Sequence, residues 1–221
     1  MDGATLQSKV YSGYAKAAKR IGLAHDVYRP ADPLNPLAAA AKIATLPAHF
    51  RVDDRFARPN VYGKALWLAY VDGSQLQVGD YLVRAGLFGP VPAGKTLFVA
   101  AMQALLPILC VECNRVVSIG RVDAPAGVGA LAYNGDAPGT EASYMAGWPA
   151  SILQGPKGEK NEVGLPGDVR QPWWVCLLPA WPGLTIEPSD IVTDDLGRRY
   201  ITSVCELTDL GWRLTLQQSV T

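Results

Sequence analysis

Two cysteines, Cys110 and Cys113, have the CxxC spacing that is found in redox pairs and in one half of many zinc sites. A redox pair would lie at the start of a helix that follows a strand, and a structural zinc site would need a second pair. Here the pattern lies in a strand-like run, where residues three apart face opposite ways, and Cys176 and Cys205 are isolated. We therefore interpret both cysteines as buried apolar side chains and expect no metal.

A second pattern resembles a phosphate-binding loop. In residues 89–96, Gly89 is followed five residues later by Gly94-Lys95-Thr96, as in GxxxxGKT. The context is wrong for that function, because two prolines stiffen the loop and remove a backbone donor, and the next residues predict a strand and not a helix. We interpret the segment as a hairpin loop, and a nucleotide-binding enzyme that uses residues 89–96 is the less favoured alternative.

The chain has two histidines, His25 and His49, and neither lies near a plausible nucleophile. A serine or cysteine hydrolase site is therefore unsupported. Acidic pairs at residues 53–54 and 194–195 both lie in predicted turns, where aspartate side chains cap the backbone. We expect a protein that is not an enzyme and has no catalytic, cofactor-binding or metal-binding residues.

The chain of 221 residues is long enough for one large domain or two small ones with apolar cores. Basic and acidic residues number 20 each, and this zero net charge argues against a sequence-independent nucleic-acid binder. The 22 glycines and 17 prolines are spread along the chain and favour a β-rich protein with many loops. No apolar segment follows Met1 and none approaches a membrane span, so we expect synthesis in the cytoplasm, reduced cysteines and no membrane contact.

Residues 4–21 predict the principal helix. Apolar residues recur there at three- and four-residue spacing, and Gly22 suits the position after the last turn. The helix is either an amphipathic helix with a solvated basic face or a docking helix for an acidic partner. Tyr11 and Tyr14 lie among its basic residues, a composition that is common at interfaces, so we select them as candidate subunit contacts.

Residues 29–37 predict an extended arm, because prolines recur there at three-residue spacing. Two interpretations stay open: a linker that lies on its own domain, or an arm that reaches a neighbouring subunit. Proline limits the unfolded states of such a segment and so lowers the cost of ordering it across a subunit boundary. Tyr28 and Arg29, where the arm begins, are therefore also candidate subunit contacts.

Two stretches of similar plan predict small antiparallel β units. Residues 77–83 resemble residues 187–193, because each has a turn residue, then an aspartate, then two apolar strand residues. The strand-like segments that follow these two stretches are 96–100 and 108–111 in the first unit, and 200–204 and 212–216 in the second.

The sequence thus predicts a mainly β fold, with two small antiparallel β-barrel or sandwich-like units preceded by one N-terminal amphipathic helix and an extended Pro-rich arm. Trp173 and Trp174 open the second β unit and complete the candidate subunit contacts. The expected boundaries are residues 1–62 for the helix and arm, 63–123 for the first β unit, 124–171 for a loop or linker region, and 172–221 for the second β unit.

Several segments of this chain resemble structural proteins of tailed-bacteriophage virions, and together they cover most of its length. The segments that carry the resemblance are residues 6–18, Tyr28-Arg29-Pro30, residues 77–83 and 106–109, Asn114-Arg115 and residues 206–214. These are packing and turn motifs and not catalytic ones. Within that class the plan is similar to head–tail connector, neck and collar proteins, in which a short helix or arm joins small β-barrel units.

The resemblance implies a virion subunit that assembles with itself into a cyclic homo-oligomer, a ring around the DNA passage. It implies contacts with portal, adaptor or tail proteins, no membrane, no sequence-specific nucleic acid, and only passive contact with passing DNA. A tail or baseplate adaptor is the alternative role within the particle. We expect the protein to be made and assembled in the cytoplasm of the bacterial host and to reside in the virion.

Overall fold

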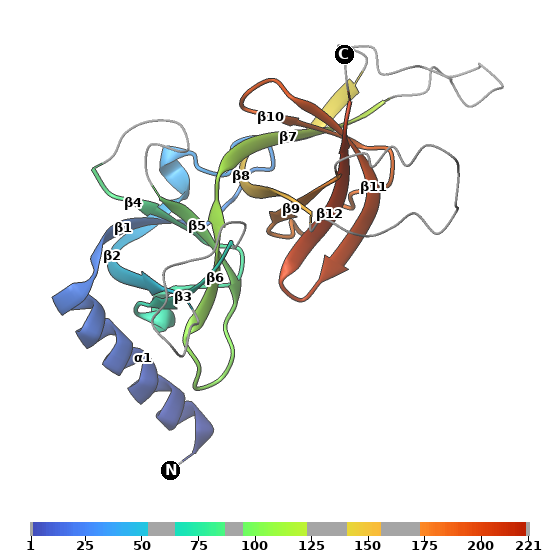
Figure 1. Ribbon diagram of the computed structural model, residues 1–221. Coiled ribbons are helices and arrows are strands. Elements are labelled where there is room, and N and C mark those ends of the chain that lie inside the picture. The colour runs from blue at the N-terminus through green and yellow to red at the C-terminus, as the bar shows by residue number, and fades with distance from the viewer. Residues whose placement is uncertain (1, 53–64, 87–94, 123–140, 156–172, 220–221) are drawn as a thin grey trace.

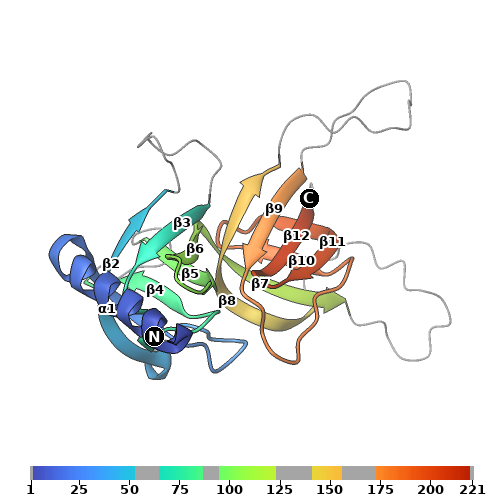
Figure 2. The same ribbon diagram turned by 90° about the horizontal axis from the view of Figure 1, so that it is seen from below.

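A computed structural model describes residues 2–52, 65–86, 95–122, 141–155 and 173–219. Within these ranges the chain forms one long helix, α1 (Gly3–Ile21), and two closed antiparallel β-barrels that lie side by side (Figures 1 and 2). No helix in the described ranges is both long and apolar enough to cross a membrane. The predicted mainly β fold, with one N-terminal helix and two barrel units, is confirmed.

Each barrel uses six described strands in the same order. Barrel 1 is ordered β1-β2-β3-β6-β5-β4, and barrel 2 is ordered β7-β8-β9-β12-β11-β10. The strands of barrel 1 are β1 (Leu23–Tyr28), β2 (Lys42–Arg51), β3 (Leu66–Tyr70), β4 (Tyr81–Arg84), β5 (Thr96–Ala101) and β6 (Ile108–Cys113). The strands of barrel 2 are β7 (Arg115–Val122), β8 (Glu141–Gln154), β9 (Trp173–Leu178), β10 (Ile191–Asp194), β11 (Arg199–Thr208) and β12 (Gly211–Gln218). Two short 3-10 helices, η1 (Ala39–Ala41) and η2 (Gly73–Gln75), lie in the connections of barrel 1.

The two barrels are equivalent in register as well as in order. Trp67 lies opposite Cys110 in barrel 1, as Trp174 lies opposite Leu216 in barrel 2. A register shift follows Val99 in β5, and another follows Thr202 at the same place in β11. The repeat that the sequence suggested therefore extends through all six strands of each barrel.

The structure corrects the expected domain boundaries. The residues assigned to a helix and arm, 1–62, also contain β1 and β2, and the first β unit, 63–123, ends with β7 of the second barrel. The linker region, 124–171, contains the 14-residue strand β8. These strands escaped detection because proline, glycine and small residues interrupt their apolar alternation, so pairing with neighbouring strands decides their conformation.

A bidentate ion pair closes each barrel where its first and fourth strands meet. Arg29, just after β1, donates from Nε and Nη2 to Asp80, just before β4, at 2.8 and 2.7 Å. Arg121, near the end of β7, donates to Asp190, just before β10, at 2.7 and 2.9 Å. Both aspartates are buried, and such two-pronged pairs impose orientation as well as attraction.

Each of these aspartates also organises the loop that precedes its strand. The carboxylate of Asp80 accepts the backbone N–H of Gln77, and that of Asp190 accepts the backbone N–H of Glu187. The residue before each aspartate has a positive φ, 91° at Gly79 and 76° at Ser189. The Gly79 N–H donates to a carbonyl of β5, and the Ser189 N–H donates to a carbonyl of β11. Ser189 thus adopts a conformation that favours glycine, and the surrounding hydrogen bonds hold it there.

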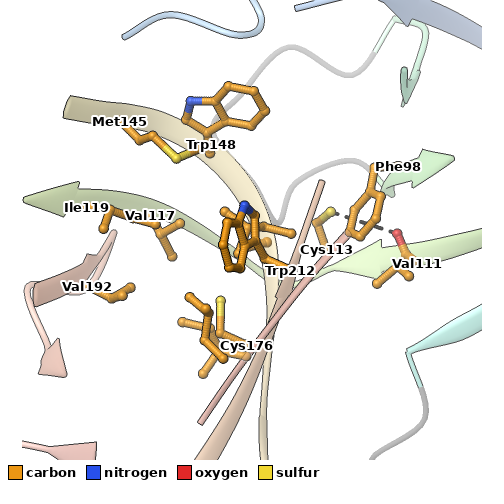
Figure 3. Packing of buried hydrophobic residues seen from close by; sticks show 14 of the residues in the cluster. Phe98, Val111, Cys113, Val117, Ile119, Met145, Trp148, Cys176, Val192 and Trp212 are labelled. Atoms are coloured by element: carbon orange, nitrogen blue, oxygen red, sulfur yellow. Dashed lines mark hydrogen bonds between the residues drawn. The ribbon is translucent and has the colours of Figure 1, made fainter. Parts of the chain in front are cut away.

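Apolar side chains form two clusters. One cluster fills barrel 1, and the other fills barrel 2 and continues into the contact between the barrels. Tyr81 and Phe98 project outward from barrel 1 into this contact, where the Tyr81 hydroxyl donates to the carbonyl of Pro149 at 2.9 Å (Figure 3 shows Phe98 and Trp148). The ring of Trp148 lies 6.2 Å from that of Tyr81, edge to face. The two barrels therefore share one continuous buried surface.

Helix α1 packs on the outside of barrel 1. Asp2 caps its first turn by accepting from the Thr5 N–H at 2.7 Å, and the Gly22 N–H closes its last turn on the Ala18 carbonyl. Its inner face contacts β2, β3 and η2 (Figure 2). The Gln7 side chain accepts the N–H of Leu105 in the β5–β6 turn at 2.7 Å.

The Pro-rich arm lies on the second barrel of its own chain. The carbonyl of Pro33 accepts from Trp148 Nε1 at 2.6 Å and from the Ala146 N–H at 3.0 Å, so the arm covers part of β8. Leu37 packs against the cluster that joins the barrels. The arm therefore contacts its own chain, but on the second barrel and not on the domain to which the sequence prediction assigned it. That it also reaches a neighbouring subunit stays a prediction.

The ion pairs generate a stability prediction. We expect Asp80→Ala to lower the free energy of unfolding by about 3 kcal/mol, because it removes a buried partner of Arg29 and the acceptor of the Gln77 N–H. Arg213→Gln, which breaks an exposed pair with Glu206, is the control, and its expected effect is below about 1 kcal/mol. Urea unfolding followed by tryptophan fluorescence measures both, and equal effects would contradict the assigned role of Asp80.

Candidate functional site

The two cysteines of the CxxC pattern lie in different clusters. Cys110 points into the core of barrel 1, whereas Cys113 points into the cluster that joins the barrels, as expected for residues three apart in β6. Burial raises the pKa of both thiols well above the ordinary value, so neither is a ready thiolate. In the described ranges no three His, Cys, Asp or Glu side chains are grouped as a metal site.

The histidines have structural contacts. His25 is buried in β1, its ring packs edge to face on Phe50 at 5.1 Å, and Nδ1 lies 2.8 Å from the Leu23 carbonyl oxygen. Burial lowers the pKa of His25, which keeps the ring neutral near pH 7. The ring of His49 lies beside Tyr70 at 6.3 Å. These contacts place neither histidine beside a nucleophile of the described residues.

Of the two acidic pairs, residues 53–54 lie outside the described residues, and residues 194–195 form a turn as predicted. Asp194 accepts the backbone N–H groups of Leu196 and Arg198 at 3.0 and 2.9 Å and the side chain of Arg198 at 2.9 Å. These bonds use both carboxylate oxygens in holding the β10–β11 turn.

The phosphate-loop pattern is followed by a strand. Residues 87–94 lie outside the described residues, but Thr96 begins β5, which pairs with β4 in antiparallel fashion. A phosphate-binding loop instead presents its donors at the N-terminus of a helix. Lys95 lies with Nζ 4.1 Å from the centre of the Trp67 ring and 3.8 Å from Glu112, so its charge already has partners within the chain.

The candidate subunit contacts of the N-terminal segment face their own chain. Tyr14 packs edge to face on Tyr70 at 5.1 Å, and the Tyr11 ring covers Gly73 so closely that a Cβ there would clash with it. Tyr28 packs against the cluster that joins the barrels, and Arg29 forms the ion pair described above. These four residues therefore position the helix and close barrel 1.

The two candidate tryptophans also have contacts within the chain. Trp173 at the start of β9 covers Gly155, and Trp174 packs edge to face on Tyr200 at 6.2 Å against the core of barrel 2. All six candidates are thus side chains that hold the fold together. Aromatic and basic composition selected them because such residues are common both at interfaces and in the contacts between elements.

The structure shows a cleft between the barrels that the sequence did not indicate. Its volume is about 250 Å³, and it lies between Phe98 and Val111 of barrel 1 and Leu210 and Trp212 at the end of the β11–β12 hairpin. Its other lining residues are the apolar Leu66, Ala100 and Leu177 and, on the hairpin, Thr208, Gly211 and the charged Glu206, Asp209 and Arg213, so it is an apolar recess with a polar rim. One face of the hairpin thus lines a recess toward barrel 1, and on its other face Trp212 and Leu214 are buried in the core of barrel 2.

The β11–β12 hairpin carries several exposed apolar side chains of barrel 2. It continues beyond the barrel to a two-residue turn, and Val204 and Leu207 on β11 are 55% and 58% exposed (Figure 1). The sequence prediction ended this strand at residue 204, whereas β11 continues to Thr208. The longer strand could have been found from the alternation in residues 205–208, which continues to the turn.

No family model matches this chain, and neither a curated protein nor a solved structure matches it.

Thiol reactivity tests the placement of the cysteines. Cys205 is partly exposed and the other three cysteines are buried, and burial raises the pKa of the Cys176 thiol to about 12. We expect a thiol reagent such as DTNB to modify one cysteine per chain rapidly in dilute native protein and three more only on unfolding. Cys205→Ser, the control, would remove the fast phase; rapid modification of Cys110 or Cys113, located by mass spectrometry, would contradict the structure.

The environment of Lys95 gives a second prediction. We expect Lys95→Ala to leave the response to Mg-ATP unchanged, because the flanking elements form a hairpin and not the strand–loop–helix of a nucleotide site. Calorimetric titration of both proteins checks this, with Lys16→Ala, on the exposed face of α1, as the matched lysine control. Binding by the native protein that only Lys95→Ala abolishes would revive the nucleotide-binding alternative.

Proposed function

We propose that this chain is a non-enzymatic structural subunit of a tailed-phage virion, in the neck or head–tail connector, where copies of it form a ring around the DNA passage. The phage assignment is supported by the resemblance of its packing and turn motifs. The two-barrel architecture with one N-terminal helix agrees with the plan that this resemblance implies.

The observation that carries an assembly role is the contrast between buried polar groups and exposed apolar ones. Asp80, Asp190 and Asp194 are buried and bonded to arginines and backbone N–H groups of their own barrels. The projecting hairpin, in contrast, presents Val204 and Leu207 to solvent. Polar groups held in this way maintain a rigid framework, and exposed apolar groups on a projection provide a contact surface for other proteins.

A tail or baseplate adaptor is the alternative role within the particle. The same rigid pair of barrels with a projecting hairpin serves either position, because both require contacts with several neighbouring proteins. The partners of this proposal are therefore copies of the chain itself together with portal, adaptor or tail proteins.

Localisation in the particle tests the proposal. We expect the protein, labelled with an epitope at the C-terminus and detected with gold-conjugated antibody, to appear at the junction of head and tail in electron micrographs of phage particles. Label at the tail tip would support the adaptor role. An untagged phage and a phage with the same tag on its major capsid protein are the controls, and absence of the protein from washed particles would reject a virion function.

A further inference from the structure

We propose that the free edge of β11, residues 203–208, binds the same edge of a second copy of this chain and so extends the two hairpins into one four-stranded sheet. The inference concerns self-association alone, and it can hold or fail whatever the position of the protein in a particle.

The first argument is that half of β11 has one unpaired edge. β10 pairs with β11 only along residues 199–201, and the last bonds on that side are made by Thr202, whose N–H donates to the Asp190 carbonyl and whose carbonyl accepts from the Ser189 N–H. β12 continues along the other side as far as Thr208. No described strand pairs with the first side of β11 beyond Thr202. An exposed strand edge of this kind is a template for pairing with another strand.

The register of β11 shows which backbone groups are free. The hairpin closes at Thr208 and Gly211 with a two-residue turn, and the antiparallel pattern then alternates along the strand. Residues 204, 206 and 208 therefore direct their N–H and C=O groups toward β12. Cys205 and Leu207 direct theirs outward, to the free edge.

The second argument is that comparable features elsewhere in the chain are covered. The Pro33 carbonyl bonds to β8 at Ala146, and the β5–β6 turn, which corresponds to the end of the β11–β12 hairpin, bonds through Leu105 to Gln7 of α1. In the described part of the chain the β11 edge has no such cover, and Figure 1 shows the hairpin projecting from barrel 2.

The third argument is that this edge is complementary to itself. A two-fold axis at Glu206 sets Cys205 opposite the partner's Leu207, and Leu207 opposite the partner's Cys205. Both positions direct their backbone groups outward, so this register forms four backbone hydrogen bonds. An axis at Cys205 would form only two, because Ser203 lies at the register shift of β11 and does not face outward in the same way.

Side chains support the same register. Cys205 and Leu207 lie on the face of the hairpin that buries Trp212 and Leu214 in barrel 2, so pairing sets the apolar Cys205 and Leu207 of each copy side by side on one face of the extended sheet. On the other face each Glu206 lies opposite the Arg213 of its own hairpin, with 3.6 Å between the charged groups. The row across the four strands becomes Arg213, Glu206, the partner's Glu206 and the partner's Arg213. Its net charge is zero, but its two central carboxylates repel each other.

Such a contact is isologous, since the same edge is used by both copies. A ring requires heterologous contacts instead, so the β11 contact pairs subunits or joins two rings face to face. The second copy is favoured over an unrelated strand because it supplies the matching pattern of outward residues and the arginine on each side of the acidic pair.

Sedimentation velocity over a concentration series tests the proposal. Leu207→Pro removes one outward N–H without removing a bond to β12, and we expect it to raise the dissociation constant of the pair at least about tenfold. Leu207→Lys should also raise the dissociation constant. Ile21→Lys, which replaces a similarly exposed apolar side chain at the end of α1, should leave it unchanged. In a larger assembly the Leu207 variants should halve the particle mass. Thermal unfolding must show that each variant is folded.

Two further variants test the register. Glu206→Gln removes the repulsion between the central carboxylates and should tighten the pair several-fold, because like charges opposite one another are destabilising. A short bis-maleimide should join Cys205 to the partner's Cys205, about 8 Å apart in this register. A chain that stays monomeric, association that survives Leu207→Lys, or a pair that neither tightens in Glu206→Gln nor crosslinks would each overturn the proposal. Capture of an unrelated strand by monomeric protein would overturn it in favour of that partner.

Discussion

Each barrel depends on a pair between a partly exposed arginine and a buried aspartate at the seam where its first and fourth strands meet. In the order β1-β2-β3-β6-β5-β4, the chain crosses after β3 to the other edge of the sheet, where β4 pairs with β1 and closes the barrel. The Arg29–Asp80 pair holds the start of β4 against the end of β1. The same carboxylate holds the preceding loop through a backbone N–H. Burying the aspartate charge is costly, so the pair adds orientation more than net stability, and its geometry must be satisfied for the barrel to close.

The duplicated barrels differ in what covers their outer surfaces. Phe98 on β5 is buried against barrel 2, whereas Ile201, at the equivalent place on β11, is exposed. Tyr70 on β3 is covered by Tyr14 of α1, whereas Leu177, its equivalent on β9, lines the cleft that faces barrel 1. Helix α1 thus occupies on barrel 1 the place that barrel 1 occupies on barrel 2. Among the described elements none covers the outer edge of the β11–β12 hairpin.

The side chains that could take part in catalysis or metal binding instead pack in the cores or hold turns. The Cys110 thiol, the His25 ring and the Asp194 carboxylate are each buried with partners from their own barrel. A framework of this kind leaves recognition to its surface, where the hairpin combines exposed apolar side chains with backbone groups that no described strand pairs with. The proposed assembly role and the proposed pairing of two copies both follow from this division between a rigid interior and a projecting hairpin that offers a binding surface.

The sequence by itself determined the elements whose signals are local. Helix α1, the turn before β10, the hairpin around residues 87–94 at its described flanks, and the opposite directions of Cys110 and Cys113 all depend on periodicity or turn chemistry within a few residues. The repeat of an aspartate followed by a short strand also indicated two related units. Only the tertiary structure decided that β1, β2, β7 and β8 belong to the barrels. The alternation of apolar and polar residues is interrupted in these segments, so they form strands only when they pair with neighbouring strands.

The partners of Arg29 and Arg121, 51 and 69 residues away, and the docking of the arm on β8 were likewise decided by the fold. A short stretch of sequence does not distinguish an arginine that closes a barrel from one that contacts a neighbouring protein, because the residues that flank the two kinds of arginine are of the same types. Closure brings distant segments together, and that contact exists only once the strands have paired.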